Sequence, residues 1–244
     1  MNPTITDIED LIREAPGLDR VSFHERRLSE LMQGGLSSTE IVALIDADSD
    51  LRNWMQQPLG AYGLEAGALW RHSLATAITV DLSSSFSRVP VLPSAFAAAL
   101  LHDAGKLVLS SRLDDTDTTR LRRAKKNQRL SDDQAEMEIL KLCHGDLGAH
   151  LAARWGLSEV AVQGIRHHHS PILAPTAEAR RVAAQVALGD AVAQEVGAGC
   201  GSGARTKPFT AAIAGLLSIS REGFRALCHE VEHHLDEGVE TIAA

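Results

Sequence analysis

The sequence of 244 residues is poor in aromatic residues, cysteines and long apolar runs, and each shortage excludes a class of protein. Aromatic residues make up only 4% of the chain, while alanine and leucine are abundant, which favours helices over sheets. Cys143, Cys200 and Cys228 lie far apart without a C-x-x-C spacing, so we expect no disulfide framework. No stretch reaches the roughly 18 apolar residues that a membrane-spanning helix requires.

The chain is also short of basic residues, with a formal net charge of −8. A general nucleic-acid binder is therefore disfavoured, because phosphate contacts need clustered Lys and Arg. The exception is the run RLRRAKKNQR at 120–129, which we interpret as a solvated helix face. Its alternatives are a docking site for an acidic partner or a phosphorylated ligand and, more weakly, for nucleic acid. The N-terminus has no apolar core of a signal peptide, so we expect a cytoplasmic protein.

Apolar residues recur at helical spacing, and no alternating, strand-like run exceeds a few residues. We therefore predict an all-α multi-helix bundle. A smaller N-terminal helical segment, residues 1–63, precedes a core over residues 64–236 and could belong to the same domain. Turn-forming residues at Pro58, Gly60 and Gly63 mark the joint.

The same pattern and its capping residues give the expected helices. In the N-terminal segment they lie near residues 8–12, 28–32, 37–45 and 49–57. In the core we expect helices over 65–83, from Pro93 through the whole of PSAFAAALLHDAGKLVL, 131–144, 149–155, 158–167, 176–196 and 220–236, with a flexible loop at 197–208.

The dipeptide His102-Asp103 stands in the most apolar of these expected helices. Buried charged groups are costly unless they pair or bind a metal ion, so both residues need partners. Candidate partners occur on other apolar helices, and they are His72, His144, His168, His169 and Asp190.

These residue types indicate metal chemistry. Neutral imidazoles and carboxylates suit zinc, iron and manganese. A carboxylate such as Asp103 can bridge two ions, and two ions about 3.5–4 Å apart are the usual device for attacking a phosphoester with water. The alternative is a buried polar network in which Asp103 and Asp190 accept hydrogen bonds from the histidines.

The chain resembles the HD superfamily of metal-dependent phosphohydrolases and, within it, the HDOD branch of signalling domains. The matching segments cover residues 64–196, and they are LWRHSLATA (69–77), AALLHDAGKLVL (98–109), HGDLGAHLAARWGLS (144–158), GIRHHHSP (164–171) and LGDAVA (188–193).

The resemblance implies roles for individual residues. His72, His102, Asp103 and Asp190 match the basic metal site of the superfamily. His144, His168 and His169 match the positions that hold a second metal in the related HD-GYP phosphodiesterases, and the following proline favours His168 and His169 over His167. The implied cofactor is one or two divalent ions of Fe, Mn or Zn. Lys106 matches a lysine that binds substrate phosphate, so Asp103 and Lys106 are the candidate catalytic residues.

The sequence also departs from HD-GYP enzymes. No G-Y-P motif follows the histidine pair, and Ala68 stands where some of them place a glutamate for a third metal. The resemblance therefore implies a bacterial signal transduction or regulatory domain acting as a standalone adaptor, with a signalling protein or a small phosphorylated ligand as its partner. The alternative is an active metal-dependent phosphohydrolase that cleaves nucleotides or phosphodiesters.

Other polar residues have simpler interpretations. We expect Arg71 and Arg166 to form outward-facing salt bridges and Cys143 to be a small core residue. His229, His233 and His234 are expected on the surface of the final amphipathic helix.

Overall fold

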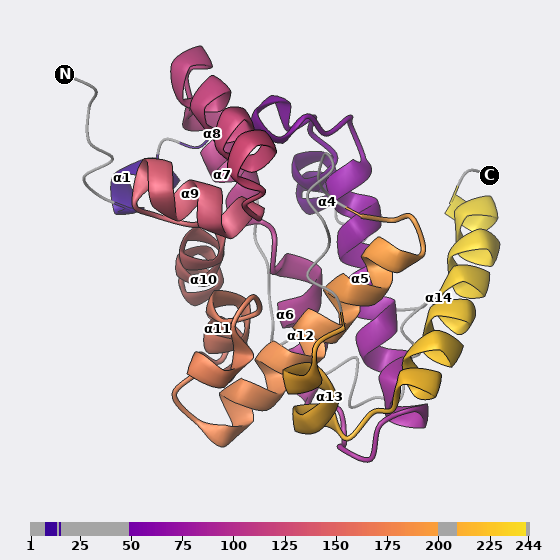
Figure 1. Ribbon diagram of the computed structural model, residues 1–244. Coiled ribbons are helices and arrows are strands. Elements are labelled where there is room, and N and C mark those ends of the chain that lie inside the picture. Colours follow the sequence, from indigo (N-terminus) through magenta and orange to yellow (C-terminus); the bar gives the residue numbers. More distant parts are fainter. Residues whose placement is uncertain (1–7, 14, 16–48, 200–208, 243–244) are drawn as a thin grey trace.

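The computed structural model describes residues 8–13, 15, 49–199 and 209–242, and within these residues it contains helices and no strand (Figure 1). The prediction of an all-α bundle is confirmed. The α-helices are α1 (Ile8–Arg13), α4 (Ser49–Met55), α5 (Ala68–Leu82), α6 (Pro93–Leu101), α7 (Gly105–Arg112), α8 (Asp115–Gln128), α9 (Asp132–Leu140), α10 (His144–Arg154), α11 (Glu159–Arg166), α12 (Ala177–Glu195), α13 (Ala211–Leu217) and α14 (Arg221–Ile242). Short 3-10 helices are η2 (Gly60–Tyr62), η3 (Ser83–Ser85) and η4 (Pro171–Leu173).

Several helices begin where a side chain satisfies their first backbone N–H groups. The hydroxyls of Ser158 and Thr176 accept from the backbone N–H of Ala161 and Ala179, as the sequence predicted for α11 and α12. At the start of α9, the backbone N–H of Ser131 donates to the Gln134 side chain at 3.1 Å. This bond is one half of the expected capping box.

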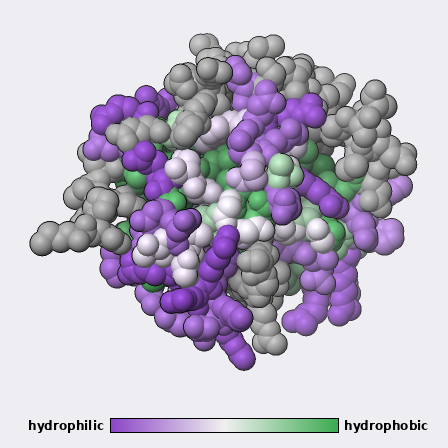
Figure 2. Space-filling model, turned by 90° about the horizontal axis from the view of Figure 1, so that it is seen from above, coloured by the Kyte–Doolittle hydropathy of each residue, from purple (hydrophilic) through white to green (hydrophobic). Residues whose placement is uncertain are grey.

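The hydrophobic core lies around α5, α6 and α12, which pack against one another at the centre of Figure 1. Every residue of α6 from Ala95 to Leu101 is buried, because apolar side chains cover all its faces. Leu11 and Ile12 of α1 belong to the same apolar cluster. A second cluster joins α13 and α14 to α5 and α12. In Figure 2, polar side chains cover most of the described surface, and apolar side chains show mainly near the centre of the view.

Some predictions concern residues outside the described part of the chain. They are the helices near 28–32 and 37–45, most of the loop at 197–208, and Cys200. Among the described residues, Cys143 and Cys228 are free thiols. No helix in that part of the chain combines the length and the apolar character needed to cross a bilayer.

The prediction of one continuous helix from Pro93 through His102-Asp103 was wrong. The chain leaves the α-helix after Leu101 and turns through His102–Ala104 before α7 begins at Gly105. Backbone bonds over three residues replace the helical pattern here, from Ala104 N–H to Leu101 and from Lys106 N–H to Asp103. The interruption of the α-helix therefore falls at the dipeptide that the sequence singled out.

Other helix boundaries also differ from the predictions. The helix expected to continue to His144 ends at Leu140, and Lys141 adopts a left-handed conformation with φ 60°. His144 instead begins α10. Helix α13 was not predicted, and α14 extends to Ile242 rather than ending near residue 236.

Glycines allow two pairs of helices to approach closely beside the histidine and aspartate side chains. A Cβ atom at Gly105 of α7 would lie 2.1 Å from the backbone oxygen of His144 in α10. A Cβ atom at Gly189 of α12 would lie 2.6 Å from the backbone oxygen of Thr76 in α5. Neither position has room for a larger residue, because a backbone atom rather than a flexible side chain stands in the way.

We expect Gly105→Ala to destabilise the protein by about 1–3 kcal/mol, because α7 and α10 must separate to admit the methyl group. Urea denaturation of purified protein measures this change. Gly215→Ala in α13 is the matched control, because nothing lies within 4 Å of its added Cβ. The control should leave stability unchanged or raise it by about 0.4–1 kcal/mol. Equal effects of the two substitutions would contradict the proposed close approach.

Candidate metal centre

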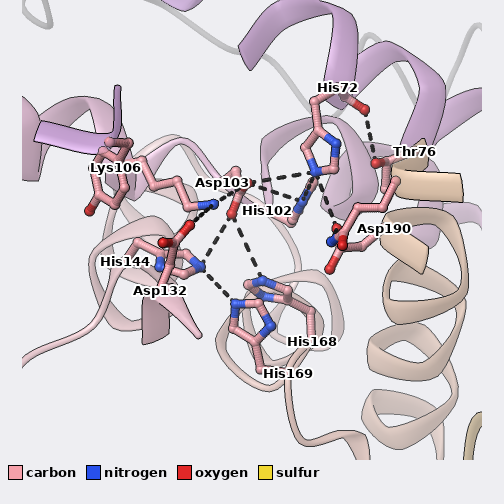
Figure 3. Close-up of polar contacts among 12 residues, drawn as sticks. His72, Thr76, His102, Asp103, Lys106, Asp132, His144, His168, His169 and Asp190 are labelled. Atoms are coloured by element: carbon pink, nitrogen blue, oxygen red, sulfur yellow. Dashed lines mark hydrogen bonds and ion pairs between the residues drawn. The ribbon is translucent and has the colours of Figure 1, made fainter. Parts of the chain in front are cut away.

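The predicted site residues converge from separate helices onto one buried cluster (Figure 3). Asp103 lies in the short turn between α6 and α7. The remaining residues come from the turn itself, from α5, α7, α10 and α12, and from the turn after α11, and they are His72, His102, Lys106, His144, His168, His169 and Asp190.

Three of these side chains form a first group on the α5 and α12 side. His72 Nε2 lies 3.2 Å from His102 Nε2 and 3.3 Å from an Asp190 carboxylate oxygen. One potential ligand atom from each residue lies within 4.8 Å of the other two. Both histidines are almost completely buried.

His144, His168 and His169 form a second group on the α10 and α11 side. His144 Nε2 lies 2.8 Å from His169 Nε2, and one nitrogen from each of the three rings lies within 4.8 Å of the others. His144 and His168 are buried, whereas His169 is partly exposed. His167, the first histidine of the triplet, is also partly exposed and does not belong to this group.

Asp103 stands between the two groups. Its Oδ2 atom lies 3.7 Å from His72 Nε2 and 3.6 Å from His102 Nε2. Its Oδ1 atom lies 3.2 Å from His144 Nε2 and 4.0 Å from His168 Nε2. Each carboxylate oxygen therefore faces one histidine group, which is the placement required of a bridging ligand.

Backbone carbonyls set the proton positions on three of the rings. Nδ1 of His72 faces the Ala198 carbonyl at 3.0 Å. Nδ1 of His102 and of His168 faces the carbonyl of the residue three positions earlier, at 2.7 and 2.6 Å. Because a carbonyl oxygen only accepts, Nδ1 carries the proton and the Nε2 lone pairs point into the cluster.

The Nε2 lone pairs of His72 and His102, which lie 3.2 Å apart, repel each other unless a cation lies between them. Within the described residues, Asp103 Oδ1 and His168 Nε2 are buried without any hydrogen-bond partner. A buried polar atom without a partner costs free energy. Imidazole nitrogens and carboxylate oxygens are suitable ligands for zinc, iron or manganese, so the residues present fit a divalent ion.

Two supporting residues escaped the sequence interpretation. The fully buried Glu136 of α9 accepts from Nδ1 of His144 at 2.7 Å and from the Tyr62 hydroxyl at 2.7 Å. Burial, followed by the nearby Glu136 charge, raises the pKa of Tyr62 well above its usual value, so the hydroxyl stays protonated and donates. Only the glutamate in an otherwise apolar position, beside Ala135, could have indicated this contact.

An ion-pair chain also enters the site from α8 and α9. Lys106 Nζ lies 2.8 Å from Asp103 and 3.3 Å from Asp132, and Lys125 pairs with the other oxygen of Asp132. Asp132 was not among the candidate residues. The interpretation of 120–129 as a solvated face is wrong for Lys125, whose side chain is only 10% exposed, whereas Arg120, Arg122, Arg123 and Lys126 are exposed.

The remaining polar candidates lie away from the cluster. Arg71 is exposed, and Arg166 lies 3.9 Å from the Asp146 carboxylate. His229 and His233 are exposed on α14, and His234 is partly exposed.

Burial sets the protonation state of the histidines. It lowers the pKa of His102, and it lowers the pKa of His168 to about 3, with His102 adding to the effect. Burial also opposes the charged form of His144, but the Glu136 carboxylate overrides it and raises the pKa. Although burial opposes ionisation of Asp103, Lys106 holds the pKa of that carboxyl well below its usual range.

The HDOD domain family matches this chain over residues 36–171, which is more than half of its length. The chain belongs to the HDOD domain family. A search of curated proteins found no match.

Two crystal structures are similar to this HDOD protein. One is a protein of Marinobacter aquaeolei VT8 provisionally assigned to signal transduction, with 21% identity and a TM-score of 0.60 over 78% of this chain. The matched region spans only 40% of that protein's length. The other is an HDOD domain protein of unknown function from Geobacter sulfurreducens, with 18% identity and a TM-score of 0.57 over 97% of this chain and 98% of the other. At these identities the likeness concerns the fold.

The low pKa of His168 predicts that acid destabilises the metal-free protein. The unfolded chain binds a proton below about pH 6.5, whereas the folded chain keeps His168 neutral down to about 3. The free energy of unfolding should therefore fall by about 1.4 kcal/mol between pH 7.5 and 5.5 from His168 alone. Urea denaturation after dialysis against a chelator measures the decrease.

Two variants isolate this contribution. The glutamine in His168→Gln cannot be protonated. In this variant the free energy of unfolding should therefore fall by about 1.4 kcal/mol less between pH 7.5 and 5.5 than in the wild type. The exposed His229→Gln should leave the loss unchanged. An unaltered pH dependence in His168→Gln would show that this ring is not held neutral in the fold.

Proposed function

We propose that this HDOD protein is a regulatory domain in cytoplasmic signal transduction whose core binds two divalent metal ions, with a signalling protein or a small phosphorylated ligand as its partner. The observation that carries the metal centre is the position of Asp103 between two histidine groups. In this arrangement His72, His102 and Asp190 would hold one ion, while His144, His168 and His169 would hold the other. Asp103 would contribute one oxygen to each.

The charges in the cluster support this assignment. Four largely buried carboxylates face two largely buried ammonium groups, so the cluster has an excess of two negative charges when its histidines are neutral. The acids are Asp103, Asp132, Glu136 and Asp190, and the bases are Lys106 and Lys125. Buried charge of this size requires compensation, which protons on histidine or divalent ions would supply.

The contacts of Lys106 favour regulation over catalysis. In a hydrolase this ammonium group would neutralise charge on a substrate phosphate. Here it lies between the carboxylates of Asp103 and Asp132, and its side chain is only 5% exposed. A substrate phosphate would have to replace one of these carboxylates. The absence of a G-Y-P motif after His168-His169 favours the same conclusion.

We expect the purified protein to bind two equivalents of Mn, Fe or Zn, as measured by elemental analysis after loading and desalting. Asp103→Asn should weaken the binding of both ions, because it replaces one of the two carboxylate oxygens with an amide NH2 group and removes the bridging charge. His72→Asn should reduce occupancy to one ion, and His144→Asn should do the same for the other ion. The exposed His229→Asn should retain two. A wild-type protein that cannot be loaded would refute the metal centre.

The second candidate function is a metal-dependent phosphohydrolase. It is favoured by the convergence of all seven predicted ligand residues, since a scaffold alone does not need them. A bound divalent ion supplies Lewis-acid activation of water and of a phosphoryl oxygen. The chain's own contribution would be to exclude bulk water around Asp103. Lys106 would also have to give up its contact with Asp132 before its ammonium group could reach the phosphate.

Hydrolysis assays separate the two functions. The regulatory proposal expects no turnover of bis(p-nitrophenyl) phosphate or of nucleotides by the metal-loaded protein beyond that of the Asp103→Asn variant. Metal-dependent turnover that Asp103→Asn abolishes would instead establish the hydrolase. His229→Asn controls for any effect of changing a histidine elsewhere on the surface.

A further inference from the structure

Glu136 has an unusual number of contacts with one ligand residue. Its Oε2 atom accepts from the backbone N–H of His144 at 2.7 Å and from Nδ1 of the same residue at 2.7 Å. Its Oε1 atom accepts from the Tyr62 hydroxyl at 2.7 Å. Both oxygens of this fully buried carboxylate therefore receive hydrogen bonds, and His144 is held by its backbone and its ring together.

The carboxylate makes His144 different from three other histidines in the cluster. His72, His102 and His168 direct Nδ1 to neutral backbone carbonyls. A carboxylate accepts the Nδ1 proton more strongly and increases the electron density at Nε2. A metal-binding histidine with such a partner is better oriented and more basic.

We propose that Glu136 is a positioning residue that orients His144 and makes its Nε2 atom a stronger ligand for the second ion. We further propose that Tyr62 holds Glu136 in place. The inference rests on the proposed two-ion centre. Glu136 acts through His144, which belongs to the group with His168 and His169, and not through the group of His72, His102 and Asp190. Loss of the Glu136 charge should therefore weaken the binding of one ion more than that of the other.

A purely structural role for Glu136 predicts a different result. The same carboxylate connects α9 to the first residue of α10 and satisfies a backbone N–H at that helix start. If this were the whole function of Glu136, its substitution would lower stability and weaken the binding of both ions alike, since Asp103 lies between the two histidine groups. The experiment must therefore resolve the two binding steps.

Three variants make the test. Glu136→Gln keeps the shape of the side chain and removes its charge, and Tyr62→Phe removes only the supporting hydroxyl. Glu138→Gln is the matched control, because it makes the same chemical change on an exposed residue of α9. Titration with Mn(II), with free Mn(II) counted by electron paramagnetic resonance, gives a Kd for each step. Nitrogen-15 NMR of the metal-free protein detects the His144 Nδ1–H directly.

We expect Glu136→Gln to raise the Kd of one step by 10–100-fold and to leave the other within about twofold. Tyr62→Phe should raise the Kd of that same step by less, and Glu138→Gln should change neither step. In the NMR spectrum, the hydrogen-bonded Nδ1–H of His144 should move upfield in Glu136→Gln only. If Glu136→Gln does not fold, the selective effect of Tyr62→Phe decides the proposal.

Equal weakening of both steps, or no change in either, would overturn the positioning role. The outcome is separable from failure of the two-ion centre. If wild-type protein binds no Mn(II), the metal centre fails, while the NMR signal still reports whether Glu136 holds the ring of His144. An Nδ1–H signal that does not respond to Glu136→Gln would overturn the inference on its own.

Discussion

The burial of Asp103 between two sets of imidazoles is the constraint on which the rest of the site depends. A carboxylate in this position is tolerable only with positive charge nearby, and Lys106 supplies one such charge at 2.8 Å. The Nε2 lone pairs around it create a space that favours a cation. Lys106, Asp132 and Lys125 then connect this charge outward to α8 in an alternating chain.

The helices approach closely enough to build this cluster because glycine stands at two of their contacts. Gly105 brings α7 against the backbone of His144, and Gly189 brings α12 against the backbone of Thr76, one turn from His72. The break after Leu101 serves the same purpose, because it lets His102 and Asp103 leave an otherwise apolar helix. The same backbone positions therefore determine both how closely the helices pack and where the ligand side chains lie.

Much of the site could be predicted from the residues. His102-Asp103 was conspicuous because two polar residues interrupt an apolar run, and their partners stood on other apolar helices. Asp132 was missed because a charged residue in a polar stretch gives no signal of burial. Glu136 and Tyr62 were missed because they meet across 74 residues of the chain. The tight turn at His102–Ala104 was also missed, because the local sequence favours a continuous helix.

The sequence by itself determined the helical class, most core helices and the residues with ligand chemistry, because periodicity and residue type are local properties. Only the tertiary structure decided how those residues divide into two groups, which oxygen of Asp103 faces each group, and which ring nitrogens point inward. These features depend on where helices cross and on which carbonyl or carboxylate meets each imidazole. Contacts between residues far apart in the chain set the two groups and the orientation of Asp103 and His72, and hydrophobic periodicity does not encode such contacts. The carbonyls that orient His102 and His168 lie only three residues away, but the turns that present them form only in the folded chain.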